Sequence, residues 1–166
     1  MPHAFGGAIA LAYCTLEPRG TIDIDCNVFV PAGAAGPALA ALPAEVARPE
    51  VVDEIVARDG QVRLWWDEVP LDLFFDYAPI HADAAAHART VEFQGEQIPV
   101  LGPLELVVFK AMFDRTRDWA DIEAVFEAGE ANPTQVRRVL ASLLDRDDAR
   151  LARVTDAARR AGADPD

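Results

Sequence analysis

A run of alternating polar and apolar residues, Thr21–Val30, constrains the fold more than any other part of the chain. Its even-numbered positions are all apolar, whereas its odd-numbered positions include Thr21, Asp23, Asp25 and Asn27. This period of two predicts a half-buried β-strand whose polar side chains lie on one face. We therefore expect Asp23 and Asp25 to point the same way, ~6.6 Å apart along the strand.

Two carboxylates on one strand face repel each other unless a cation lies between them. Because oxygen ligands suit magnesium or manganese, Asp23 and Asp25 are candidate metal ligands. The alternative is a solvated strand face with two surface acids. A third acid, Asp72, interrupts the apolar run 70–75. It would share a metal ion or a hydrogen-bonding partner if buried, or face solvent if its strand lies at a sheet edge.

A double glycine, Gly6-Gly7, opens a segment that we predict to be a short helix over residues 7–13. The start of a helix presents unpaired N–H groups and the positive end of the helix dipole, and glycine allows a phosphate to approach closely. The glycine pair alone is a weak signal. Combined with the acidic strand, it predicts a site for a triphosphate and its metal ions.

The composition bounds the class of protein. The chain has 166 residues, of which 51% are hydrophobic, which predicts a folded domain with a real core. A formal charge of -13 argues against an extended nucleic-acid surface, although a short nucleotide could bind locally. No apolar run reaches membrane length, and Cys14 and Cys26 are expected to be reduced core thiols. We expect a cytoplasmic protein with no membrane partner.

The remaining pattern predicts a mixed sheet followed by helices. Strands are expected at 61–66 and 69–75, and again at 90–93 and 98–101, as two antiparallel hairpins. Hairpins exclude a purely parallel sheet. The predicted class is α/β or α+β, with a small mixed sheet of three to five strands flanked by helices. Four helices are then predicted at 103–115, 118–128, 133–144 and 149–161.

Lys110 is the only lysine among fifteen basic residues, and it lies in a helix that is apolar nearly all round. Such a helix is buried, so its lysine either extends to the protein edge or meets a carboxylate or phosphate. Asp118 and Asp121 fall in the first turn of the next predicted helix. Acids suit the dipole there, and the alternative is that they orient Lys110 or Arg115.

Together these residues resemble the nucleotidyltransferase superfamily of the DNA polymerase β type. The Arg-x-Thr-x-Asp-x-Asp form of Arg19 to Asp25 resembles, more narrowly, the AbiEii-like branch, which includes toxins of type IV toxin-antitoxin systems. The helical stretch is similar to that branch's signature of a lysine, then an arginine, then Asp-x-x-Asp. The residues that carry the resemblance are Gly6-Gly7, Arg19-Gly20-Thr21, Asp23-Ile24-Asp25, Leu71-Asp72-Leu73, Lys110, Arg115, Asp118 and Asp121.

The resemblance implies a nucleotidyltransferase-like core over residues 1–127 and a C-terminal helical extension over 128–166. It also implies that the element before the double glycine is shortened, because only Met1–Phe5 precede it. The implied reaction moves a nucleoside monophosphate from an NTP to an acceptor hydroxyl on RNA, protein or a small molecule, and is metal-dependent. The chain would then be a toxin-antitoxin component.

The resemblance also assigns roles to single residues. Asp23 and Asp25 would hold two magnesium (or manganese) ions, and Asp72 would share one and align or deprotonate the acceptor. Residues that would bind the phosphates are Gly6, Gly7, Arg19, Thr21 and Lys110, with Asp118 and Asp121 supporting Lys110. The implied partners are an NTP, an unknown acceptor and a cognate antitoxin or other partner protein. The alternative is a non-catalytic module of this fold that binds nucleotide or a protein partner.

Overall fold

The computed structural model of the protein describes residues 1–164, and the chain divides into two compact units. The first unit comprises Met1–Ile9 and Arg19–Leu101 and contains the sheet. The second comprises Ala10–Pro18 and the chain from Gly102 onward, and it is helical. The boundary passes through α1 (Gly7–Thr15). These units follow packing, so the division at residue 127 that the resemblance implies stays a prediction.

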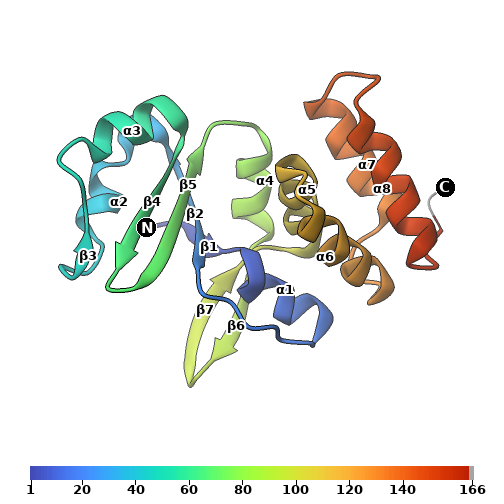
Figure 1. The fold of residues 1–166 in the computed structure, drawn as a ribbon, viewed down its shortest axis with the longest axis horizontal. Coiled ribbons are helices and arrows are strands. Elements are labelled where there is room, and N and C mark those ends of the chain that lie inside the picture. Colours follow the sequence, from blue (N-terminus) through green and yellow to red (C-terminus); the bar gives the residue numbers. More distant parts are fainter. Residues whose placement is uncertain (165–166) are drawn as a thin grey trace. The chain divides into compact units, whose positions relative to one another are not determined.

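Within residues 1–164, seven strands form one mixed sheet in the order β3-β4-β5-β2-β1-β7-β6 (Figure 1). The pairs β2–β5 and β1–β7 are parallel, and the other neighbours are antiparallel. The mixed α/β class predicted from the hairpins is therefore confirmed. The strands are β1 (His3–Phe5), β2 (Ile24–Pro31), β3 (Val46–Ala47), β4 (Gln61–Trp66), β5 (Val69–Asp76), β6 (Arg89–Phe93) and β7 (Glu96–Val100).

The sheet is larger than the three to five strands expected. The two additional strands, β1 and β3, have three and two residues, too few to show an alternating pattern. The start of β2 also differs from the prediction, because the strand begins at Ile24 and not at Thr21. The Thr21 hydroxyl binds the carboxylate of Asp23, a local side-chain contact that competes with strand pairing. Asp23 therefore precedes the strand instead of lying within it.

One face of β2, β4 and β5 is apolar and packs against η1 (Ala32–Ala34), α2 (Gly36–Ala40) and α3 (Val52–Asp59). Phe75 and Leu64 are almost completely enclosed in this core. Burial of each such side chain contributes roughly 1.5–3 kcal/mol. Because alternate side chains face opposite ways, the same packing sends Arg63, Asp72 and Asp25 to the other face. Figure 1 shows α4 (Ile80–His87) on the side of the sheet away from α2 and α3.

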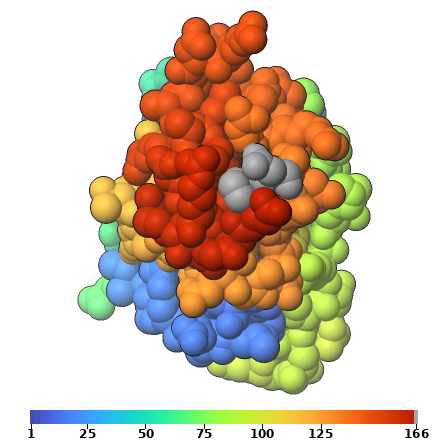
Figure 2. Space-filling view, turned by 90° about the vertical axis from the view of Figure 1, so that its right-hand side faces the viewer, coloured from blue at the N-terminus to red at the C-terminus, as the bar shows by residue number. Residues whose placement is uncertain are grey.

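The second unit contains the four predicted helices, each with boundaries within two residues of the expectation. Asn132 caps the third of them, since its side chain accepts a hydrogen bond from the backbone N–H of Gln135 at 3.1 Å. The last two helices form the orange and red face in Figure 2. No helix within residues 1–164 is both long and apolar enough to cross a membrane. The helices are α5 (Pro103–Phe113), α6 (Thr116–Glu127), α7 (Pro133–Leu143) and α8 (Ala149–Arg160).

Candidate nucleotide and metal site

Three charged residues form a row across the polar face of the sheet. Arg63 of β4 pairs in register with Asp72 of β5, and Asp72 in turn pairs with Asp25 of β2. Neighbouring strands lie ~4.8 Å apart, so residues in register on one face are adjacent. The fold thus brings together two of the predicted catalytic aspartates from distant parts of the chain, with an arginine beside them.

The double glycine continues this row. The backbone N–H of Gly6 donates a hydrogen bond of 2.9 Å to the carbonyl oxygen of Asp25. Gly7 has a left-handed φ of +50°, and a Cβ placed on it would lie only 1.8 Å from Oδ2 of Asp25. Only glycine fits this approach between the start of α1 and the Asp25 carboxylate. A phosphate bound at the start of α1 beside Gly7 would therefore meet a carboxylate, and the two anions would need a cation between them.

The carboxylate of Asp72 is bound at both oxygens by Arg63. The Nε of Arg63 donates to Oδ1 at 2.7 Å and its Nη2 donates to Oδ2 at 2.5 Å. This pairing raises the pKa of Arg63, first through the hydrogen bond and then through the charge of Asp72, with smaller contributions from Asp23 and Asp25. All three predicted aspartates therefore act on one guanidinium.

Sequence reasoning missed Arg63, although a signal was present. The two-residue turn Asp67-Glu68 between the two predicted strands fixes the register of the hairpin. Counting outward from that turn places Arg63 opposite Asp72, which is the pairing observed. An aspartate in an otherwise apolar strand needs a polar partner, and the hairpin register identifies Arg63 as the partner of Asp72.

The residues before β2 form a local polar cluster. The Thr21 hydroxyl donates to the carboxylate of Asp23 and lies 3.3 Å from its backbone carbonyl oxygen. Thr21 is exposed, whereas Asp23 and Arg19 are half-buried. The predicted phosphate-binding roles of Arg19 and Thr21 stay predictions. Asp23 lies close enough to the row to act on the charge of Arg63.

The donor chemistry of this row fits a hard divalent cation. Asp25 and Asp72 provide carboxylate oxygens on adjacent strands, and the Asp25 carboxylate lies directly against the backbone of Gly7. Within residues 1–164, however, no group of three or more His, Cys, Asp or Glu side chains is arranged to hold a metal ion. The positive charge next to Asp72 is the guanidinium of Arg63.

The opposite face of the sheet has a different character. An apolar cavity of about 430 Å³ lies there, with walls from β1, β2, β5 and α2, and no carboxylate lines it. Burial, and secondly the charge of Asp25, raise the pKa of the Cys26 thiol on this face to about 12. Cys26 is therefore a neutral core thiol, and the cavity is lined mostly by apolar side chains.

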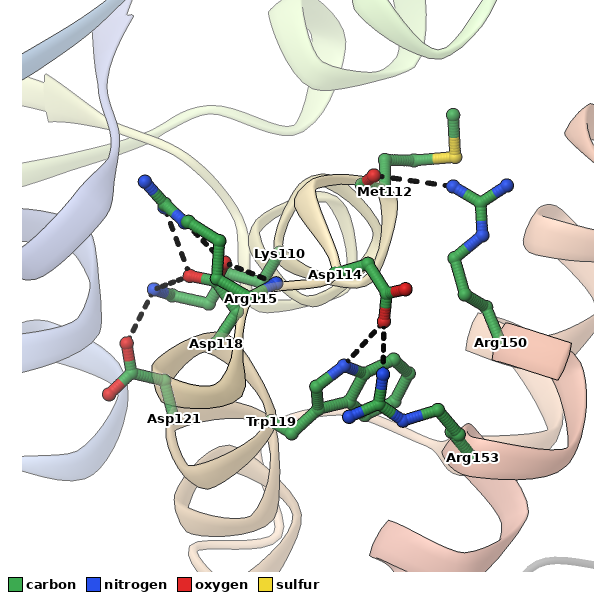
Figure 3. A network of polar contacts seen from close by, with 9 residues as sticks. All are labelled: Lys110, Met112, Asp114, Arg115, Asp118, Trp119, Asp121, Arg150 and Arg153. Carbon is green, nitrogen blue, oxygen red and sulfur yellow. Dashed lines mark hydrogen bonds and ion pairs between the residues drawn. The ribbon is translucent and has the colours of Figure 1, made fainter.

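In the second unit, Lys110 belongs to a buried ionic network (Figure 3). Its Nζ lies 2.6 Å from Oδ2 of Asp121 and 3.6 Å from Oδ1 of Asp118. Asp118 also accepts hydrogen bonds from the side chain of Arg115, at 2.7 Å and 3.1 Å. Burial would raise the pKa of Asp118, but the hydrogen bond from Arg115 and the charge of Lys110 outweigh it, and the pKa is lowered.

The network continues toward α8. The carboxylate of Asp114 accepts a hydrogen bond of 2.8 Å from the indole of Trp119, and it also binds Arg153. Arg150 donates to the backbone carbonyl of Met112 at 3.3 Å, next to the C-terminus of α5. These contacts tie α5, α6 and α8 together through charged groups as well as through apolar packing (Figure 3).

The predicted site residues thus form two groups, each within its own unit. In the first unit, Gly6 and Gly7 contact Asp25, and Asp25 pairs with Asp72. In the second unit, Asp118 and Asp121 contact Lys110. The catalytic and binding roles of both groups stay predictions.

The mixed sheet and its flanking helices form a nucleotidyltransferase-like fold, as a comparison with a solved structure shows. The chain is similar to the crystal structure of an antigenic nucleotidyltransferase-like protein from Paracoccidioides brasiliensis. The TM-score is 0.52 at 15% sequence identity, and the match covers 92% of this chain and 83% of that one. At this identity the likeness concerns the fold alone. No protein-family model matches the sequence, and no curated protein shows significant similarity.

Proposed function

We propose that the protein is a metal-dependent nucleotidyltransferase that moves a nucleoside monophosphate from an NTP to an acceptor hydroxyl. One observation carries the proposal: Asp25 and Asp72 are in register on adjacent parallel strands, and Gly7 at the start of α1 approaches the Asp25 carboxylate too closely for any side chain. Glycine N–H groups and paired carboxylates are what a triphosphate and its cations require. The shared fold with a nucleotidyltransferase-like protein supports the same conclusion.

In this proposal Gly7 and the N–H groups that follow it in α1 bind the triphosphate, and Gly6, whose own N–H is bonded to Asp25, lets the phosphate approach because it has no side chain. Asp23, Asp25 and Asp72 would hold Mg²⁺ or Mn²⁺, which when bound neutralises charge on the phosphates and on the attacking oxygen. The acceptor oxygen forms a bond to the α-phosphorus while the bond from that phosphorus to the bridging oxygen of the β-phosphate breaks. Pyrophosphate leaves with the electron pair, and the carboxylate of Asp72 takes the hydroxyl proton.

Lys110 is proposed to neutralise charge on the leaving pyrophosphate. Its ammonium is buried and its charge is balanced by Asp121 and Asp118, so a phosphate would have to compete with these two carboxylates for it. Arg19 and Thr21 are proposed to contribute to phosphate binding beside Asp23. These assignments rest on the sequence resemblance together with the contacts described above.

The narrower assignment to the AbiEii-like branch is part of the proposal and rests on the two sequence signatures alone. With it come a role as a toxin-antitoxin component and a cognate antitoxin as partner. The acceptor is RNA, a protein or a small molecule. A long nucleic-acid footprint is disfavoured, because the arginines of α8 are offset by acids, as in the pairs Arg159–Asp156 and Arg160–Glu123.

A second candidate function is favoured by the contact of Arg63 with Asp72. An aspartate that forms an ion pair with an arginine is a weaker base, which disfavours proton transfer from an acceptor to Asp72. The protein would then be a module of the same fold that binds nucleotide, or a protein partner, without turnover. The two functions differ in one observable, the release of pyrophosphate.

The test measures pyrophosphate release and transfer of an α-phosphate label from each NTP, with Mg²⁺, to RNA, protein and small-molecule acceptors. Asp72→Asn should abolish both signals. The control is Asp76→Asn, an aspartate at the other end of the same strand, and it should keep them. Metal-dependent NTP binding without release for every acceptor class would support the non-catalytic module instead.

A further inference from the structure

Arg63 and the proposed metal ion would both bind the carboxylate of Asp72. Both oxygens of Asp72 are bound by the Arg63 guanidinium, at 2.7 and 2.5 Å. A divalent cation bound by Asp72 needs at least one of those oxygens. A guanidinium and a divalent cation are both positive, so the presence of either one at this carboxylate weakens binding of the other.

The exposure of the two side chains decides which of them can move. The Asp72 side chain is only 15% exposed, whereas that of Arg63 is 54% exposed. Asp72 also lies on β5, which is paired on both sides, with β4 and β2. The carboxylate is thus fixed, while the arginine can swing into solvent. Ion pairs with an exposed partner are weak, so releasing this one costs little.

The negative charge around Arg63 explains why a cationic side chain lies there. Asp25 is next to Asp72 in register, and Asp23 also acts on the Arg63 charge. Without a cation, the carboxylates would repel one another on a partly enclosed face. A guanidinium satisfies Asp72 with two parallel hydrogen bonds, but its charge is spread over a plane and is smaller than that of a divalent ion.

We propose that Arg63 is a built-in counter-ion that competes with the divalent cation for Asp72 and weakens metal binding while it stays there. This inference rests on the proposed function, since it assumes that the aspartates bind a metal ion. It adds a residue that neither the sequence motifs nor the resemblance identified.

The test is Mn²⁺ binding by the full chain at low ionic strength, followed by the electron paramagnetic resonance signal of free Mn²⁺. Arg63→Gln should bind Mn²⁺ at least about fivefold more tightly than wild type, which is the effect of removing a competing ion pair. The matched control is Arg58→Gln. It removes the same charge from an exposed pair with Asp59 on α3, which packs on the other face of the sheet. Its affinity should stay within about twofold of wild type.

Arg63→Lys gives a second comparison, because it keeps the charge and loses the paired hydrogen bonds. Its affinity for Mn²⁺ should lie between those of wild type and Arg63→Gln, and it carries the test if Arg63→Gln does not fold. Affinities of the Arg63 variants equal to or weaker than that of Arg58→Gln would overturn the inference. The proposed function would still stand after that result if Asp25→Asn failed to bind Mn²⁺ while wild type and the other variants bound it. Folded wild type and Arg63→Gln that both fail to bind Mn²⁺ would overturn the metal site, and the inference with it.

Discussion

Gly7 and Asp25 lie so close together that no side-chain atom fits on Gly7. A Cβ there would lie only 1.8 Å from Oδ2 of Asp25. The glycine is thus required by a close approach of the backbone as well as by its φ of +50°. This contact joins the start of a helix to a carboxylate on the central part of the sheet. It is the local geometry on which the proposed site depends.

Gly7→Ala should destabilise the protein more than Gly60→Ala does. Both glycines have positive φ, but the nearest atom to a Cβ on Gly60 is 3.5 Å away, which is an ordinary contact. Gly60→Ala should therefore cost only the left-handed strain of about 1–2 kcal/mol. Gly7→Ala should cost about 1–3 kcal/mol more, since Asp25 must move. Urea unfolding measures both, and equal losses would contradict the proposed close approach.

Removing one partner of the buried Lys110–Asp121 pair should lower the free energy of unfolding more than replacing both partners with apolar residues. Lys110→Met leaves the carboxylates of Asp118 and Asp121 buried without their ammonium. Breaking a buried pair of this kind costs about 3–5 kcal/mol in unfolding free energy. The double variant Lys110→Met/Asp121→Leu should recover part of that loss. If the loss of unfolding free energy in the double variant exceeds the sum of the losses in the two single variants, the pair does not act as described.

The lowered pKa of Asp118 predicts how stability depends on pH. Its pKa lies below the ordinary 3.8 in the folded protein, because the hydrogen bond from Arg115 and the charge of Lys110 overcome the effect of burial. The stability it contributes is therefore present above pH 3.8 and is lost as the pH falls toward the folded pKa. Arg115→Gln should move the acid-unfolding midpoint, followed by circular dichroism, to higher pH.

The control for that shift is Arg159→Gln. Arg159 also pairs with an aspartate three residues away on its helix, but both partners are mostly exposed. Pairs of this kind contribute little to stability. The acid-unfolding midpoint of Arg159→Gln should match that of wild type, and a shift as large as that of Arg115→Gln would mean that net charge alone sets the midpoint.

Much of the fold follows from residues close together in the sequence. The two hairpins and the four helices of the second unit were predictable, because alternation, turn residues and prolines at helix starts are local signals. The first strand, His3–Phe5, was not, since three residues show no period. The start of β2 was predicted too early in the chain, because the side-chain contact between Thr21 and Asp23 keeps these residues out of the strand.

The roles of the candidate site residues stay predictions, and the pairings between these residues followed only partly from the sequence. Asp25 and Asp72 meet through parallel strands, and no turn in the sequence fixes the register of such strands. Arg63 is the opposite case, because the short turn before β5 does fix its position opposite Asp72. Whether an arginine or a metal ion neutralises Asp72 depends on a competition between the two, which local patterns do not reveal.

The central claim is that the row of Gly7, Asp25 and Asp72 binds an NTP with a divalent cation, and calorimetry tests it without knowledge of the acceptor. Wild type should bind at least one NTP with Mg²⁺ and lose that binding when the metal is chelated. Asp25→Asn should weaken binding at least about tenfold, or roughly 1.4 kcal/mol. Asp59→Asn, which removes the same charge from an exposed residue of α3, should leave binding unchanged. Absence of binding to all four NTPs by folded wild type, or equal binding by Asp25→Asn, would contradict the account.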